Sequence, residues 1–119
     1  MNRVAELLPN EIFVYGSNLL GNNLGGAALQ AKESFGAEDG IGEGLTGRCY
    51  AFPTLGYNMN PQEIEEMEWS RDKLYSTARA LPDKIFLLTP VGTGIAGFNK
   101  SFMEKLFEDL PSNIKKVGW

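Results

Sequence analysis

Apolar residues recur along the chain with two different periods, and this alternation predicts strands separated by helices. Short runs rich in β-branched and aromatic residues, which are typical of buried strands, cover Glu11–Tyr15, Arg48–Phe52 and Lys84–Thr89. Apolar or small residues at helical spacing cover Leu24–Phe35 and Pro61–Ala80 between those runs. We therefore expect parallel strands joined by helices that cover the sheet.

The C-terminal part of the sequence continues this order. Ser101 is a good helix-capping residue, and an apolar stripe follows it from Phe102 to Leu110. The segment 113–117 is expected to add a short final strand. The 119 residues are predicted to form a single domain, 1–119, of the α/β class, with a mostly parallel central sheet flanked by helices.

Glycine is concentrated in two parts of the sequence. The chain has 14 glycines, most of them between Gly16 and Gly56, and a further group lies between Gly92 and Gly97. Both groups begin soon after a predicted strand. Because the carboxyl ends of parallel strands meet at one edge of a sheet, we expect the two glycine loops to border one cleft. Apolar residues between the glycines argue against a flexible linker.

The loop Gly92–Gly97 has the form GxGxxG between a strand and a helix, an arrangement that presents backbone N–H groups to an anion. It is not a dinucleotide-binding fingerprint, because that motif follows the first strand and is completed by an acid about 20 residues later. The GK[ST] motif of nucleotide triphosphatases is absent. A plain tight turn is the alternative, and the presence of two such loops favours phosphate binding over it.

Composition narrows the chemistry further. The sequence has no histidine, which removes Ser-His-Asp and Cys-His nucleophile systems and the usual zinc ligand sets, so we predict no metal and no cofactor. The one cysteine, Cys49, is expected to be a buried strand residue rather than a reactive thiol, and it gives no sign of an oxidising compartment, which favours the cytoplasm. A net charge of −4 argues against duplex nucleic acid, and no apolar run is long enough for a membrane span.

Three side chains near the glycines could contact a ligand. Asn18 follows the first strand, where its amide could hold a ribose hydroxyl or a water, or could simply form a turn. Glu43 is a lone acid among glycines and is either a solvated loop charge or a carboxylate that accepts ribose hydroxyls or acts as a base. Phe98 could pack on a sugar or base, although core packing is the simpler role.

These segments resemble those of a known family. IFVYGSNL at 12–19, GGAA at 25–28 and GTGIAGF at 92–98 look like the corresponding segments of a compact macrodomain. In that family an Asn follows an early strand, and a late strand ends in a glycine loop around the diphosphate of ADP-ribose. The wider pattern, GSNL, GGAA, GEGLTGRCYAFPT and GTGIAG, is similar to that of small uncharacterised bacteriophage proteins. The resemblance covers about 12–110.

The resemblance implies a ligand site at the two glycine loops. Asn18 matches the residue at the distal ribose, and Phe98 matches the neighbouring aromatic approximately. The segment that usually supplies an adenine-binding Asp before the first strand is missing. With the residues singled out above, Glu43 among them, the predicted ligand-binding residues are Gly16, Ser17, Asn18, Gly25, Gly26, Glu43, Gly92, Thr93, Gly94, Ile95, Ala96, Gly97 and Phe98.

The implied function is binding of an ADP-ribose-related nucleotide or nucleotide immune signal, with sequestration by a phage protein against host defence as the expected role. The alternative is an ADP-ribosyl hydrolase that acts on protein, nucleic acid or a small molecule, with Asn18 and Glu43 as candidate catalytic residues. A third reading is a structural module in which the glycines only shape turns. The expected partner is a small nucleotide, and the oligomeric state, a homo-oligomer included, stays open.

Overall fold

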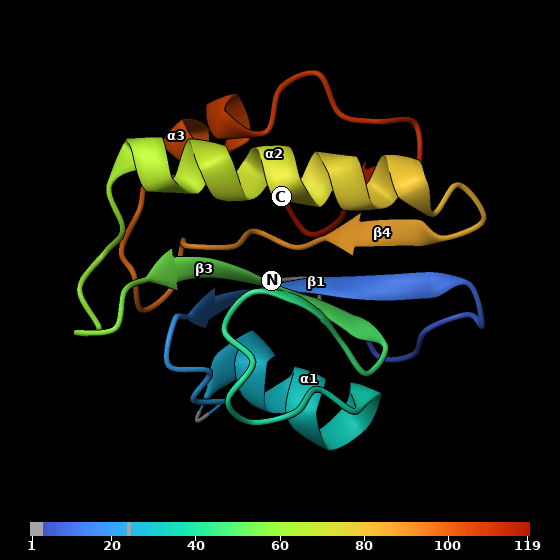
Figure 1. Ribbon diagram of the computed structural model, residues 1–119, viewed down its shortest axis with the longest axis horizontal. Coiled ribbons are helices and arrows are strands. Elements are labelled where there is room, and N and C mark those ends of the chain that lie inside the picture. Colours follow the sequence, from blue (N-terminus) through green and yellow to red (C-terminus); the bar gives the residue numbers. More distant parts are fainter. Residues whose placement is uncertain (1–3, 24) are drawn as a thin grey trace.

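The computed structural model describes residues 4–23 and 25–119 and contains one five-stranded sheet in the order β2-β3-β1-β4-β5 (Figure 1). Four strands are mutually parallel, and β2 at the edge pairs with β3 in the antiparallel direction. The expected α/β fold with a mostly parallel sheet is therefore confirmed. The strands are β1 (Glu11–Asn18), β2 (Gly44–Thr46), β3 (Cys49–Leu55), β4 (Ile85–Leu88) and β5 (Ile114–Lys116).

Helices cover both faces of the sheet. In Figure 1, α1 (Gly26–Phe35) lies on one face, and α2 (Ile64–Ala80) and α3 (Lys100–Leu106) lie on the other. Alternate residues of β1 enter the two cores, because successive side chains of a strand point to opposite faces. Phe13 and Tyr15 pack with the small residues of α1, whereas Ile12 and Val14 pack with α2 and α3. No helix in the described part of the chain is long and apolar enough to cross a membrane.

Two strands are longer than the sequence suggested. β1 continues past Tyr15 to Asn18, and β3 continues past Phe52 to Leu55. Pro53, the residue after the predicted end of this strand at Phe52, lies inside β3. β2 pairs with β3 only as far as Ala51, so the missing N–H of Pro53 removes no bond on that side.

Between α1 and β3, where the sequence predicted no further strand, the structure contains the short strand β2. The helices are shorter than predicted. The predicted start of the first helix at Leu24 lies outside the described residues, and α2 begins at Ile64 rather than Pro61. α3 is capped by Asn99, whose Oδ1 accepts from Ser101 N at 2.8 Å, so Ser101 is inside the helix rather than its cap.

Candidate functional site

The loop after β4 lies directly beside the end of β1, at the left edge of the sheet in Figure 1. Thr89 Oγ1 donates to Val14 O at 2.6 Å and continues the contact between the two strands beyond β4. A Cβ built on Gly16 would lie 3.3 Å from the backbone nitrogen of Gly92, so only a residue without a side chain allows this approach comfortably. The structure thus brings the segments around Gly16 and Gly92 together, as the strand order predicts.

The tip of the second glycine loop offers unused donors. The backbone N–H groups of Gly94, Ile95 and Ala96 donate to no acceptor within residues 4–23 and 25–119. The loop is shaped instead by bonds on either side of this tip, from Thr93 N to Pro90 O at 3.4 Å and from Gly97 N to Gly94 O at 2.9 Å. Ile95 is 86% exposed, so the tip is open to solvent. Three adjacent N–H groups at a strand end are suited to binding an anion.

The first glycine loop leads to the N-terminus of α1. Gly25 is the residue before the helix, and no side chain there caps the helix by a hydrogen bond. The first turn of α1 also contains no acidic residue. Among the described residues, no side chain caps the N-terminus of α1 and no acid of its first turn balances the positive end of the helix dipole, as in helices that bind phosphate.

Asn18 and Ser17 shape the first loop in this structure. Asn18 Nδ2 donates to Asn22 O at 3.0 Å, and Asn18 Oδ1 accepts from Asn22 N at 3.1 Å, so both amide atoms close the turn after β1. Ser17 Oγ donates to Gly42 O and joins the end of β1 to the loop before β2. Ser17 and Asn18 are both buried. The turn-forming interpretation of Asn18 accounts for these bonds.

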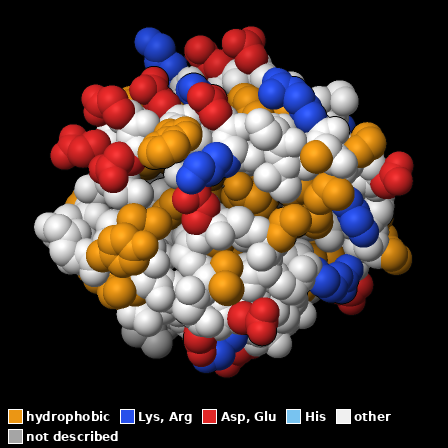
Figure 2. All heavy atoms as spheres, in the orientation of Figure 1, with side chains coloured by type: hydrophobic (Ala, Val, Ile, Leu, Met, Phe, Trp, Pro, Cys, Tyr) orange, Lys and Arg blue, Asp and Glu red, His pale blue; other side chains and the backbone are white. Residues whose placement is uncertain are grey.

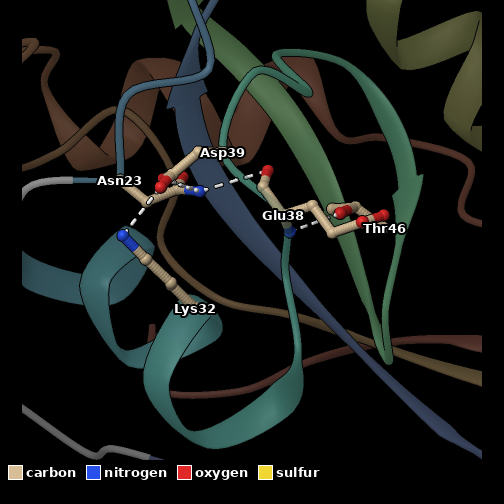
Figure 3. Close-up of polar contacts among 5 residues, drawn as sticks. All are labelled: Asn23, Lys32, Glu38, Asp39 and Thr46. Carbon is tan, nitrogen blue, oxygen red and sulfur yellow. Dashed lines mark hydrogen bonds and ion pairs between the residues drawn. The ribbon is translucent and has the colours of Figure 1, made fainter.

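The connection between α1 and β2 is fastened to the first loop by polar contacts (Figure 3). Asn23 Nδ2 lies 3.4 Å from both Glu38 O and Asp39 Oδ1, and Lys32 Nζ lies 2.7 Å from Asp39 Oδ2. Glu38 N in turn donates to Thr46 Oγ1 at 2.8 Å. The Lys32 ammonium and its hydrogen bond hold the pKa of Asp39 below its usual value. These contacts join the first loop, through Asn23, to the segment between α1 and β2, and they do not involve the glycines of the loop.

Glu43 projects toward α2. Its Oε1 lies 3.5 Å from Lys73 Nζ, and its Oε2 is buried without a hydrogen-bond partner in the described residues. Gly42, the preceding residue, presses on the end of β1, since a Cβ there would lie 2.6 Å from Asn18 O. Glu43 therefore follows directly on the residue that packs against the end of β1, and its carboxylate is paired with Lys73.

Phe98 ends the second loop and is half-buried against the core on the α2 face. Its ring stacks on Phe102 of α3, with 5.6 Å between the centroids. Packing thus fixes this aromatic at the base of the loop.

Sequence reasoning missed a hollow of about 620 Å³ between β2 and α2. Trp69 and Lys73 of α2 line it together with Glu43. The sequence did contain a signal for this hollow. Trp69 falls outside the apolar stripe of its helix, so its ring is expected to be exposed, and it lies four residues before Lys73, on the same face of the helix. The described residues contain no cluster of three or more His, Cys, Asp or Glu side chains able to share a metal ion.

Comparison with known proteins identifies the fold. No protein-family model and no curated protein matches the sequence. Among solved structures, the macrodomain of Mycobacterium tuberculosis DarG is similar, with 21% identity, a TM-score of 0.65, and coverage of 97% of this chain and 93% of that one. A protein of unknown function from Bacteroides thetaiotaomicron is also similar, with 10% identity, a TM-score of 0.64, and coverage of 95% and 91%. The chain therefore has the fold of a macrodomain.

Proposed function

We propose that this protein binds an ADP-ribose-related nucleotide and holds its phosphates at the two glycine loops. The observation that carries the proposal is the set of N–H groups at Gly94, Ile95 and Ala96 that have no acceptor in the described residues, at the tip of the loop that follows β4. An ADP-ribose diphosphate carries two negative charges and many acceptor oxygens, which complement such donors. The macrodomain fold and the resemblance of the loop sequences support the same ligand class.

Two glycines give independent support. Gly25 and Gly94 have no positive φ, and a Cβ on either would meet no atom of the described residues within 4 Å. Neither conformation nor crowding inside the chain therefore requires glycine at these positions. Close approach of a ligand to the backbone is a physical reason for glycine that does not depend on contacts within the protein.

Within this function we infer sequestration rather than hydrolysis. A hydrolase would add water across the bond between ADP-ribose and its acceptor, and Glu43 is the candidate base that the sequence offers to activate that water. Its carboxylate is instead paired with Lys73 at 3.5 Å, and both amide atoms of Asn18 bond to Asn22. Because these bonds already occupy the two candidate catalytic side chains, retention of an intact nucleotide fits the structure better than turnover does. The role in a phage that opposes nucleotide-based host defence rests on the motif resemblance alone.

Calorimetry with ADP-ribose, AMP and ribose 5-phosphate tests the binding proposal. We expect ADP-ribose to bind most tightly, because it alone offers the full diphosphate and both sugars. At one hundred times its dissociation constant, a ligand should stabilise the fold by about 2.7 kcal/mol. Absence of heat and of a thermal shift with all three compounds at millimolar concentration would contradict the proposed function.

Product analysis separates sequestration from hydrolysis. Excess ADP-ribose, ADP-ribosylated protein and ADP-ribosylated DNA are incubated with the protein, which is then denatured so that the nucleotides can be chromatographed. We expect every compound to be recovered unchanged. Multiple turnovers on any of them would establish the hydrolase, and their loss by about 10²–10⁴-fold in Glu43→Gln would identify the base. Loss in Asn18→Ala alone would place the reacting bond at the first loop.

A further inference from the structure

The first glycine loop is fastened to the segment 38–43, which connects α1 to β2. Ser17 Oγ donates to Gly42 O at the end of β1, and Gly40 N donates to Gly21 O at 3.0 Å within the loop. A Cβ on Gly21 would overlap the backbone of Gly40, so the two backbones touch there. The loop therefore lies against a second segment of the chain before it reaches α1.

Asn23 makes a third contact with that segment, two residues before Gly25. The side chain of Asn23 is buried, and its Nδ2 lies 3.4 Å from both Glu38 O and Asp39 Oδ1. Its Oδ1 is buried without a hydrogen-bond partner in the described residues. A buried amide oxygen without a donor lowers stability, so packing alone does not favour an asparagine at this position. Donation from Nδ2 to the neighbouring segment does.

Asp39 connects this anchor to the far end of α1. Its Oδ1 faces Asn23 Nδ2, and its Oδ2 lies 2.7 Å from the Nζ of Lys32, in the last turn of the helix. Figure 2 shows acidic and basic side chains next to each other over α1, at the lower margin of this face. Exposed ion pairs of this kind contribute little to the stability of the fold. The carboxylate matters more for what it joins, the residue before the start of α1 and the last turn of the same helix.

Two glycines follow the anchor and leave the start of α1 weakly constrained. A Cβ on Gly25 or Gly26 would meet no atom of the described residues within 4 Å, so no close packing fixes either position from that side. Glycine loses more backbone freedom than any other residue when it is held in one conformation. If this freedom had to be lost when a ligand binds, the affinity would fall. A bond that holds the neighbouring Asn23 beforehand reduces that cost.

We propose that Asn23 and Asp39 are positioning residues that hold the first glycine loop and the start of α1 in the conformation that receives a phosphate, without contacting the ligand themselves. The inference rests on the proposed function, in which a phosphate lies at this loop. The bond between the two side chains restricts Gly25 and Gly26 before the ligand arrives. Its loss weakens binding at the first loop and leaves the second loop, 92–97, unchanged.

Exchange of the two residues tests the bond. Asn23→Asp places a second carboxylate against Asp39 and leaves no amide hydrogen between them. Addition of Asp39→Asn restores a donor and an acceptor to the pair, with their direction reversed. We expect calorimetry to show ADP-ribose affinity about tenfold lower in Asn23→Asp and at least about threefold higher in the double variant than in that single variant. A double variant that binds no better than Asn23→Asp would overturn the proposal.

Two further variants control for lost charge and lost stability. Asp72→Asn removes another exposed aspartate from an ion pair, with Arg71 of α2 at 3.1 Å, and should leave ADP-ribose affinity unchanged. Asn23→Ala removes the donor without adding a charge and should also bind about tenfold more weakly, even if Asn23→Asp does not fold. Urea unfolding identifies the variants that are fully folded at the assay temperature, and only these are compared. Parent-like affinity in folded Asn23→Ala, or an equal loss in Asp72→Asn, would contradict the positioning role.

A measurement without ligand separates this inference from the proposed function. We expect the ¹⁵N order parameters of Gly25 and Gly26 to fall in Asn23→Asp and to recover in the double variant, while those of Gly94 and Gly97 stay the same in all three proteins. If this pattern is found and ADP-ribose does not bind the parent, the proposed function fails and the positioning of the loop stands. Order parameters of Gly25 and Gly26 that do not respond to Asn23→Asp would overturn the positioning role, whether or not ADP-ribose binds.

Discussion

Two groups of glycines in this molecule have opposite surroundings. Around the connection between α1 and β2, a Cβ added to Gly21, Gly42 or Gly47 would overlap neighbouring backbone atoms. At Gly25 and Gly94, on the two loops at the carboxyl edge of the sheet, a Cβ would meet nothing within 4 Å in the part of the chain that the structure describes. The first three are called the packed glycines here, and the other two the open glycines.

This difference separates glycines that build the fold from glycines that face outward. The packed glycines let three backbone segments touch, and Gly21 and Gly47 also have positive φ values. The open glycines have neither constraint, and the free N–H groups at 94–96 lie on the same loop as one of them. We therefore expect substitutions in the first group to affect folding and substitutions in the second group to affect binding.

The largest effect is expected from Gly42→Ala. Its new Cβ would lie 2.6 Å from the carbonyl oxygens of both Asn18 and Leu19, so the backbone must move. We expect the free energy of unfolding to fall by about 3 kcal/mol, as for an overpacked core site. Urea denaturation measures this change.

Gly94→Ala is the matched control, because it adds the same methyl group in open space. Its stability should stay within about 0.5 kcal/mol of the parent. If Gly42→Ala and Gly94→Ala were equally stable, the crowding around the packed glycines would not affect the free energy of unfolding, and the distinction would be wrong.

A second effect is expected on binding from Gly94→Val. The Cβ of the new side chain would lie in open space, and we expect its two methyl groups to hinder a ligand that approaches the N–H groups of the loop tip. ADP-ribose affinity should fall by about 2 kcal/mol, the scale of lost hydrogen bonds to a charged group, while circular dichroism and thermal unfolding stay as in the parent. Gly26→Val would be a poorer probe, because Gly26 has a φ of 56° and the substitution strains the helix start. Unchanged affinity in a folded Gly94→Val protein would remove the phosphate site from this loop.

The sequence predicted the alternating elements and the common edge of the two glycine loops, because strand periodicity and the rules of parallel sheets are local or general. It did not separate packed from open glycines, since crowding at Gly42 comes from Asn18 and Leu19, more than 20 residues away in the chain. The same holds for Glu43, whose partner Lys73 is 30 residues away. The sequence allowed Asn18 either to contact a ligand or to form a turn, and only the bonds to Asn22 show how its amide is used in this structure.

Cys49 reports on the packed region, because its thiol lies under α1 and contacts the carbonyl oxygens of Ala31 and Phe35. Burial raises the pKa of this thiol from 9.0 to about 12. Below pH 9 the thiol is protonated in both folded and unfolded protein and has no effect on the pH dependence. Between about pH 9 and 12 the unfolded thiol ionises while the folded one does not, so stability should fall by about 1.4 kcal/mol per pH unit from this group.

Urea unfolding of the parent and of Cys49→Ala at pH 8 and pH 10 measures this contribution. The variant should lose less stability over that interval, by about 1 kcal/mol, because it lacks the thiol that ionises on unfolding. Tyrosine ionisation occurs in both proteins and cancels in the comparison. Reaction of the native thiol with an aromatic disulfide at pH 8 should also be slow and limited by opening of the α1 layer. Rapid labelling of the folded protein would mean that the region around the packed glycines opens easily, and would contradict the expectation that these glycines stabilise the fold.

The smallest effect is expected from Tyr15→Phe, which tests whether the packed region is filled by the chain alone. The Tyr15 hydroxyl is buried and has no hydrogen-bond partner among the described residues, and burial, with smaller effects of Cys49 and Asp39, raises its pKa to about 12. Removal of an unpaired buried hydroxyl relieves its lost hydration, so the free energy of unfolding at pH 7 should rise by up to about 1 kcal/mol. Thermal and urea unfolding of the variant and the parent measure the change, and Tyr75→Phe is the control, because the Tyr75 hydroxyl donates to Glu108 O at 2.7 Å and its removal should lower stability. A loss in Tyr15→Phe as large as that in Tyr75→Phe would show that the Tyr15 hydroxyl is bonded, with a bound water as its partner, and that the packed region is less completely filled by the chain than its glycine contacts indicate.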